Sequence, residues 1–372
     1  MAASARPVTP PAEVPAPPVA TDAQARLREL LVPLGIALLA AGYVVLRGTT
    51  DREVSDFDQL WYGARAVFSG EDPYARIGPF GKFEWSYLYY PMPALLLVSP
   101  LALLPLLAAR ACFAAISAGM LSAALLRERP TRLLMLLSAP MLIAIGRGQM
   151  TPLLVAAAYF PWFSWIGVAK PHIALALLMG SEQPRYAMKS ALLGGAALIG
   201  ACFIVDPSWV PAWLGAVSHK TDGMSIVLRG GAGLFILTAL LRWRRSEARL
   251  LVAIGSVPQT PTFYDAVPVF LVPRGFREIA LLVIGGNLAL LLLVIAPGLR
   301  TEQIGPMYAD RIMLWSLVCL YLPATLMVLR RPNDENPVSD EGFNGGRVDV
   351  TLAIALVFSV FFAGWAILSR FL

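Results

Sequence analysis

Long apolar runs dominate this chain and set the first limit on its fold. The clearest runs lie at 29–47, 106–126, 190–205, 279–297, 312–329 and 349–369. A helix needs about 20 apolar residues to cross a bilayer. Inside lipid the backbone must satisfy its own hydrogen bonds, and a helix does this within one segment. The sequence therefore predicts an all-α integral membrane protein.

The composition leaves no room for a large soluble domain. The chain is 57% hydrophobic and 15% charged, whereas soluble domains are about 45–50% apolar and about 25% charged. We expect one membrane domain over 29–372, preceded at 1–28 by a disordered cytoplasmic tail rich in Pro and Ala. The net charge of +6 comes from Lys and Arg dispersed among short loops, which argues against a nucleic-acid partner.

Shorter apolar stretches lie between the clear runs, and proline or polar residues interrupt several of them. They are 133–145, 150–162, 164–181, 230–241 and 250–273. Threading them in different ways predicts a polytopic bundle of roughly 10 to 13 spans. Broken helices of this kind often carry the functional sites of membrane proteins.

The distribution of arginine predicts the orientation of the bundle. Arginine-rich loops at 127–132, 242–249 and 330–331 are expected in the cytoplasm, together with the N-terminus. Four segments then fall on the other side, which we expect to be the periplasmic face of a bacterial inner membrane. They are 48–90, 146–149, 206–229 and 259–265.

The first of these outer segments, the loop 48–90, contains a predicted amphipathic helix. Its apolar residues recur at helical spacing from Phe57 to Phe68, which suits a helix in the membrane interface. Ser55 fits an N-cap, and Asp58 three residues later fits a capping box. Asp56 has no such role, and helical residues two apart point about 200° from one another. Asp56 is therefore the first candidate for chemistry and Asp58 the second.

Two other interpretations of this pair stay open. Asp56 at the first helical position also complements the helix dipole, which is a structural role. The triplet Asp56-Phe57-Asp58 matches a D-x-D metal motif, but its helical placement argues against shared ligation. No cluster of His, Cys, Asp and Glu has metal-ligand spacing, so we predict no metal site and no cofactor. Asp265 becomes a second carboxylate for a divalent ion only if 250–273 folds back to the outer surface.

Several short motifs follow one another in a fixed order across most of the chain. They are Asp56-Phe57; Tyr62, Ala64, Arg65 and Ala66; Gly70; Asp72-Pro73-Tyr74; Tyr90-Pro91 before an apolar run; Gly148-Gln149; Lys170-Pro171; and Thr260-Pro261 with Tyr264-Asp265. Each motif alone is common, and their shared order and spacing carry the specificity.

In this order the motifs resemble glycosyltransferase family 87. This polyprenyl-phosphate-dependent group of the GT-C superfamily includes mycobacterial phosphatidylinositol-mannoside mannosyltransferases. The resemblance implies a GT-C-like helix bundle and inverting transfer of a hexose, with mannose as the first guess, or a pentose. The donor would be a polyprenyl-phosphate sugar and the acceptor a hydroxyl of a glycolipid or glycan. It also implies that Tyr62, Arg65 and Gln149 bind substrate.

Such a transfer needs a base for the acceptor hydroxyl and cations for the leaving phosphate. Asp56 is the predicted general base. Arg147 and Lys170, with His172, are the predicted phosphate-binding groups, because charges within apolar segments often serve an anionic ligand. Arg147 and Lys170 alternatively snorkel to the interface, and His172 alternatively packs beside Pro171.

Two functions of other classes remain in competition with transfer. Intramembrane charges and broken helices also suit a transporter or flippase for lipids or lipid-linked sugars, although the chain has no visible internal repeat. A non-enzymatic envelope assembly protein is the other alternative, and in it Asp56 would be dispensable.

Overall fold

The structure is a computed structural model that describes residues 22–50, 55–78, 87–220, 223–260, 262–295, 306–333 and 350–368. Within these ranges every regular element is a helix, and the one β-contact is an isolated antiparallel bridge between Met224 and Gln259. The all-α prediction is thus confirmed for the part of the chain that the structure describes.

Five helices of the described residues are long and apolar enough to cross a membrane. They are α1 (Asp22–Thr50), α5 (Leu106–Glu128), α9 (Pro184–Val205), α13 (Phe276–Ile295) and the continuous helix of α14 (Pro306–Ser316), η7 (Leu317–Tyr321) and α15 (Leu322–Leu329). They match five of the six clear apolar runs. The sixth forms α16 (Val350–Leu368), whose described apolar core is shorter. Residues 22–28 of the predicted tail are helical, and 1–21 lie outside the described residues.

The apolar stretches between these helices fold as short helices rather than as full spans. They are η2 (Pro130–Leu137), α6 (Ala139–Gly146), α7 (Thr151–Tyr159), η3 (Pro161–Ala169), α8 (Pro171–Met179), α11 (Gly230–Leu234), η5 (Phe235–Arg242), α12 (Ser246–Ser256) and η6 (Phe263–Leu271). Five of these nine begin with proline at their first or second residue. Proline lacks an N–H and clashes with a preceding turn, so it begins a helix but does not continue one.

This segmentation changes the number of spans. Helices α6 and α7 meet at a bend of 113°, as a broken span or a re-entrant loop, and counting them together raises the number of candidate spans to six. The described residues therefore hold five or six candidate spans by length and composition, where the sequence predicted ten to thirteen.

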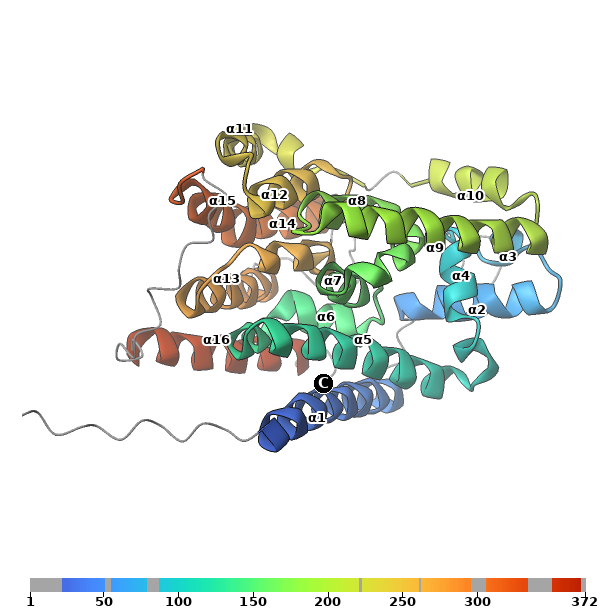
Figure 1. The fold of residues 1–372 in the computed structure, drawn as a ribbon, viewed down its shortest axis with the longest axis horizontal. Coiled ribbons are helices and arrows are strands. Elements are labelled where there is room, and N and C mark those ends of the chain that lie inside the picture. Colours follow the sequence, from blue (N-terminus) through green and yellow to red (C-terminus); the bar gives the residue numbers. More distant parts are fainter. Residues whose placement is uncertain are drawn as a thin grey trace, which may run out of the picture.

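The predicted first outer loop, 48–90, contributes α2 (Asp56–Phe68) and α3 (Pro73–Arg76). Helices α4 (Met92–Val98) and η1 (Leu101–Leu103) follow it in the chain, and all four gather at the right of Figure 1. The predicted amphipathic helix α2 exists. Its face is buried at Phe57, Leu60, Trp61 and Ala64, whereas Phe68 is 56% exposed. Because α2 packs on α3, α4, α5 and η1, its apolar face is covered by protein.

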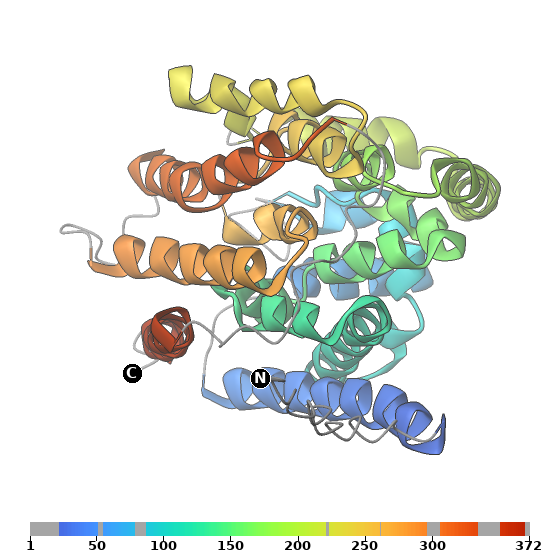
Figure 2. The same ribbon diagram turned by 60° about the vertical axis from the view of Figure 1, so that its left-hand side comes forward.

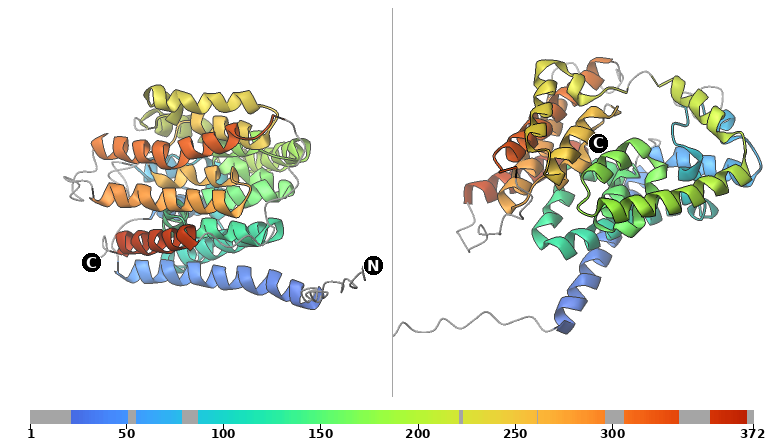
Figure 3. Two further views of the ribbon diagram at one scale, coloured as in Figure 1. Left: turned by 90° about the vertical axis from the view of Figure 1, so that its left-hand side faces the viewer. Right: turned by 45° about the horizontal axis from the view of Figure 1, so that its top comes forward.

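The long helices lie in layers. Figure 3 (left) shows α1 (blue) at one edge, then α5 and α16, then α13, then α14 and α15, with the segment 230–242 at the opposite edge. Helix α16 lies next to α13, as Figure 2 also shows. Gly48 of α1 approaches Leu107 at the start of α5, and Gly119 of α5 approaches Ala37 of α1. The two helices therefore run antiparallel in close contact.

The remaining elements, α10 (Trp209–Ser218) and η4 (Ile226–Leu228), belong to the predicted outer segment 206–229. Helix α10 lies above α3 and α4 in Figure 1 and packs against both. The Trp213 indole donates to the carbonyl of Tyr89 (3.0 Å), and Met224 pairs with Gln259. Three of the four predicted outer segments are joined by these contacts.

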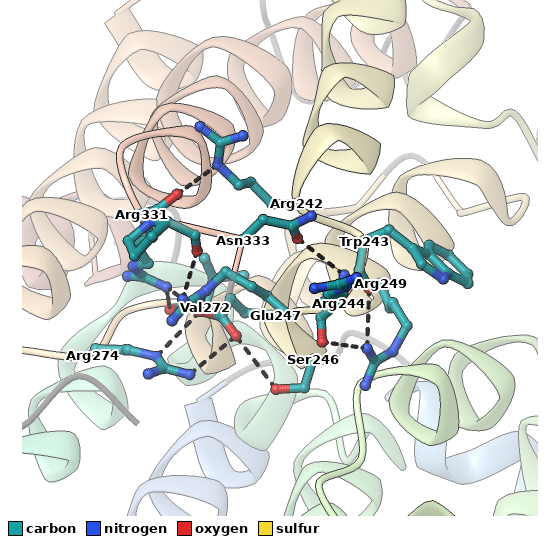
Figure 4. Close-up of polar contacts among 12 residues, drawn as sticks. Arg242, Trp243, Arg244, Ser246, Glu247, Arg249, Val272, Arg274, Arg331 and Asn333 are labelled. Atoms are coloured by element: carbon teal, nitrogen blue, oxygen red, sulfur yellow. Dashed lines mark hydrogen bonds and ion pairs between the residues drawn. The ribbon is translucent and has the colours of Figure 1, made fainter. Parts of the chain in front are cut away.

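The arginine-rich loops meet at the other end of the bundle, around Glu247. This carboxylate is 4% exposed and accepts from Arg245 (2.8 Å), Arg274 (3.1 Å) and Arg331 (2.8 Å), the Glu247 cluster of Figure 4. Arg331 also pairs with Glu278. The cluster fastens the start of α12, the start of α13 and the end of α15 to one another.

Other arginines at this end donate to backbone carbonyls at the end of α15 and in the loop before α13. Arg242 donates to the carbonyls of Leu329 (3.1 Å) and Arg331 (2.5 Å), and Arg129 donates to that of Arg274 (2.9 Å). Cations near helix C-termini satisfy carbonyls that have no intrahelical partner. The loops predicted to share one side thus lie at one end of the described chain, and which side of a membrane that end faces stays a prediction.

Candidate functional site

The start of α2 is fixed by a capping box and by the backbone of Arg147. Ser55 N–H donates to the Asp58 carboxylate (3.0 Å), and Ser55 hydroxyl donates to the Arg147 carbonyl (2.7 Å). The N–H of Phe57 donates to the same carbonyl (3.2 Å). The predicted capping box is confirmed, and it ties α2 to the bend between α6 and α7.

Asp58 has a second hydrogen-bonding partner besides Ser55. Arg110 of α5 grips both oxygens of this buried carboxylate, with Nε at 2.7 Å from Oδ1 and Nη2 in contact with Oδ2. A bidentate Arg–carboxylate pair fixes geometry as well as charge. Asp58 therefore anchors α2 to α5, and the two aspartates have different partners, as their helical spacing predicted.

The bend between α6 and α7 depends on Gly148. Its φ of +61° is a left-handed conformation that favours glycine, and a Cβ there would lie 2.6 Å from Phe57 Cβ. The N–H of Gln149 donates to the carbonyl of Ala144 (2.9 Å), which closes the turn. The turn therefore brings the Gln149 side chain to the start of α2.

Gln149 joins three functional groups. Its amide nitrogen donates to Asp56 Oδ2. Its amide oxygen accepts from the Tyr90 hydroxyl (3.0 Å) and lies 3.4 Å from Lys170 Nζ. Gln149 is buried, whereas Asp56 is partly exposed. Burial raises the pKa of Tyr90 well above its ordinary value, so the hydroxyl keeps its proton and can donate.

Lys170 is paired with a carboxylate 95 residues later in the sequence. Its Nζ donates to Asp265 Oδ1 (2.6 Å) and Thr151 Oγ1 (3.2 Å), and it lies 5.3 Å from the Tyr264 ring centre. Asp265 Oδ2 accepts from the N–H of Thr260 (3.0 Å). Burial opposes ionisation of Asp265, but Lys170 and His172 hold the pKa of that carboxyl below its usual value.

These contacts define one connected group, the Gln149 cluster. Its members are Asp56, Tyr90, Gln149, Thr151, Lys170 and Asp265. Three helices begin at this cluster: α2 at Asp56, α7 at Thr151 and α8 directly after Lys170. The N-terminus of a helix carries unpaired N–H groups and a partial positive charge. These termini add partial positive charge beside the carboxylate of Asp56 and beside the Lys170–Asp265 pair.

A second layer of aromatic and basic residues lies beside the cluster. Lys220 donates to Thr260 Oγ1 (2.8 Å) and lies 5.3 Å from the Tyr89 ring centre. His219 stacks on Tyr87 with ring centres 4.3 Å apart. These contacts join the segment after α10 to the predicted first outer loop and to the loop before η6, the helix that carries Asp265.

His172 follows Lys170 by two residues in α8. Burial and the neighbouring Lys170 lower its pKa to about 4. A neutral imidazole at pH 7 can donate one hydrogen bond but brings no charge to a phosphate.

The structure brings together only some of the residues predicted from the sequence. Asp56, Gln149 and Lys170 share the cluster. Arg147 reaches α2 through its backbone carbonyl, and its side chain is partly exposed. Tyr62 and Arg65 lie farther along α2, where each contacts the Trp61 ring.

Three cluster residues were not among the predicted site residues, namely Tyr90, Thr151 and Asp265. Tyr90 and Asp265 stand in the motifs Tyr90-Pro91 and Tyr264-Asp265, and 250–273 folds back against the predicted outer segment 206–229. Thr151 carries no signal of its own in the sequence. Its hydroxyl became relevant only through the position of Lys170.

The carboxylates of the cluster are separated by cationic and amide groups. Gln149 and Lys170 stand between Asp56 and Asp265, and among the described residues no group of three or more His, Cys, Asp or Glu could hold a metal ion. Comparison of the chain with protein-family models, curated proteins and solved structures gave no match.

Proposed function

We propose that this protein is a membrane glycosyltransferase that uses Asp56 as its general base. The observation that carries the proposal is the Gln149 cluster, which joins a partly exposed carboxylate to a fixed ammonium group through one amide. Sugar transfer from a phosphate donor needs both kinds of group close together.

Asp56 suits the general base because its carboxylate is less engaged in structural contacts than that of Asp58. Asp58 is held by Arg110 and by the N–H of Ser55, whereas Asp56 accepts from Gln149 at a partly exposed position. A general base must lie within hydrogen-bond reach of the hydroxyl that it deprotonates. The acceptor hydroxyl would approach Asp56 from its exposed side.

Lys170 suits the leaving phosphate. Charge that develops on a phosphate oxygen is stabilised best by donors fixed in advance. Asp265 and Thr151 fix the ammonium group, and the N-termini of α7 and α8 add partial positive charge next to it. Arg147 would supply a further cation from the same bend.

The finer parts of the proposal come from the resemblance of the sequence to glycosyltransferase family 87. They are a GT-C-like bundle, a polyprenyl-phosphate donor of a hexose such as mannose or of a pentose, and a glycolipid or glycan acceptor. The reaction would invert the sugar. The site would face the periplasm from a bacterial inner membrane.

The test is transfer of radiolabelled sugar from a panel of polyprenyl-phosphate donors to lipid extracts. Membranes would carry the wild type, Asp56→Asn or Asp58→Asn, with the amount of folded protein measured in parallel. We expect Asp56→Asn to abolish transfer while its folded protein stays at the wild-type level.

Two results would contradict the proposal. Equal transfer by wild type and Asp56→Asn would show that Asp56 is not the general base. No transfer from any donor by folded wild type would instead favour a transporter, which a broken span and a buried ion pair also suit.

A further inference from the structure

The orientation of the Gln149 amide follows from the chemistry of its neighbours. Lys170 has only donors, and the Tyr90 hydroxyl is protonated. Both face the same end of the Gln149 side chain, at 3.4 Å and 3.0 Å. That end must therefore be the amide oxygen. The NH₂ group is left facing Asp56, which in its ionised form only accepts.

The Gln149 backbone is fixed as firmly as its side chain. Gly148, directly before Gln149, has no space for a Cβ against Phe57. The carbonyl of Arg147, which precedes Gly148, accepts from Ser55 and Phe57. The amide donor and the helix that carries Asp56 are thus built on one rigid junction. A side chain held at both ends can orient another group with little loss of entropy.

We infer that Gln149 is the positioning residue of Asp56: its amide holds Oδ2 of the carboxylate and so directs the other oxygen, Oδ1, toward the substrate hydroxyl. This inference assigns Gln149 a role away from the phosphate. Its mechanistic part rests on the proposed function, whereas the hold on Asp56 stands on the contacts alone.

Other groups also act on Asp56 and must be kept constant in a test. Its surroundings include Tyr90 and Tyr264, the Asp58–Arg110 pair on its own helix and α5, the Lys170–Asp265 pair behind Gln149, and Arg147 at the bend. Substitution of Gln149 alone leaves all of them in the chain.

Two substitutions separate the hold on Asp56 from mere packing. Gln149→Leu keeps much of the volume and removes the donor. Gln149→Glu keeps the shape and places a second carboxyl against Asp56, so that the pair shares a proton at higher pH. Gln183→Glu is the matched control, because Gln183 is exposed at the start of α9. This position follows the end of α8 that Arg249 binds through the Met179 carbonyl, whereas the cluster lies at the start of α8.

The kinetic test is the pH dependence of sugar transfer. We expect Gln149→Leu to lower kcat by about 10²-fold, the scale of a reactant misplaced by about 1 Å, with the donor KM changed less than roughly threefold. Gln149→Glu should keep rate only where the two carboxyls share a proton, because a protonated Glu side chain can donate to Asp56 and an ionised one cannot. In alkaline buffer its rate should therefore fall toward that of Gln149→Leu. Gln183→Glu should keep the wild-type profile.

A second measurement needs no substrate. A hydrophobic carbodiimide modifies protonated carboxyls in membranes, and mass spectrometry of the peptide with Asp56 gives its labelling at each pH. A hydrogen bond donated to a carboxylate favours the ionised form. Labelling of Asp56 should therefore persist to higher pH in Gln149→Leu than in wild type, and to higher pH again in Gln149→Glu.

The outcomes separate this inference from the proposed function. Absence of transfer by wild type would sink the function, and the labelling would still decide the role of Gln149. Unchanged labelling midpoints in both variants, with thermal unfolding like wild type, would overturn the inference. A loss of rate in Gln149→Glu by the same factor at every pH would also do so, since packing alone gives that result. Should Gln149→Leu fail to fold, the isosteric Gln149→Glu decides.

Discussion

Lys170 and Asp265, 95 residues apart in the sequence, form a buried ion pair with Nζ 2.6 Å from Oδ1. The pair joins the start of α8 to the start of η6, and so links the two halves of the Gln149 cluster. Removing one partner of such a pair leaves a buried charge alone, which costs more than the pair itself contributes.

We expect Lys170→Met and Asp265→Asn each to destabilise the protein by about 3 kcal/mol or more. The double variant Lys170→Met/Asp265→Leu should be more stable than either, because no charge is left unpaired. Thermal unfolding in lipid nanodiscs measures the effect. Arg76→Met, which breaks the exposed pair of Arg76 with Glu71, should cost less than about 1 kcal/mol. A double variant less stable than both single ones would contradict this prediction.

Loss of charge at Asp58 should lower the stability of the protein, whereas loss of charge at Asp56 should change it little. Asp58→Asn and Arg110→Leu break the bidentate pair that seats α2, so both should lower the unfolding temperature. Asp56→Asn loses only a charge at a helix start, worth at most about 1 kcal/mol. Unfolding scans beside transfer assays distinguish the two, and a large stability loss in Asp56→Asn would show that Asp56 is structural.

Gly148 and Gly70 offer a matched pair of alanine substitutions. Both have positive φ, +61° and +71°, but a Cβ at 148 would meet Phe57 whereas nothing lies within 4 Å at 70. Gly70→Ala should cost about 1 kcal/mol for backbone strain alone. Gly148→Ala should cost clearly more, since Phe57 and the start of α2 must shift. Equal unfolding temperatures in the two variants would show that the bend tolerates a side chain.

Glu247 should give the stability a dependence on acid pH. Burial opposes its ionisation, but Arg245, Arg274 and Arg331 lower its pKa from 4.5 to about 2. Because the folded pKa is the lower one, the stabilisation is fully present above pH 4.5 and is lost as pH falls toward about 2. The gap in unfolding temperature between wild type and Glu247→Gln should therefore be constant from pH 6 to about pH 5 and shrink below that. A gap that stays unchanged down to pH 3 would refute this assignment.

The sequence predicted the long helices well, whereas its ten to thirteen spans exceed the five or six candidate spans among the described residues. Five of the long apolar runs became long helices because an uninterrupted run has one good solution in lipid. The stretches with internal proline can fold in several ways, because hydropathy does not distinguish a short buried helix from a span. The bend at Gly148 is an example of a break that hydropathy does not reveal, because it depends on contact with Phe57.

The site was predicted in part for a similar reason. The capping box at Ser55 is local, so spacing alone revealed the role of Asp58. Asp56 and Lys170 each have one partner more than 90 residues away, Gln149 and Asp265 respectively, and only the fold brings these partners to them. Arg110 lies 52 residues after Asp58, and only the packing of α2 on α5 brings the two side chains together.

Helix starts, rather than helix bodies, hold the Gln149 cluster, and this makes its geometry insensitive to certain insertions. Gln149 and Lys170 come before the first full turns of α7 and α8. One residue added farther along either helix turns the later part of that helix by about 100°, but leaves these side chains in place. One residue added between Gly146 and Gln149 moves the amide itself. Related chains can therefore vary in helix length downstream of the cluster while the spacing of that bend must be kept.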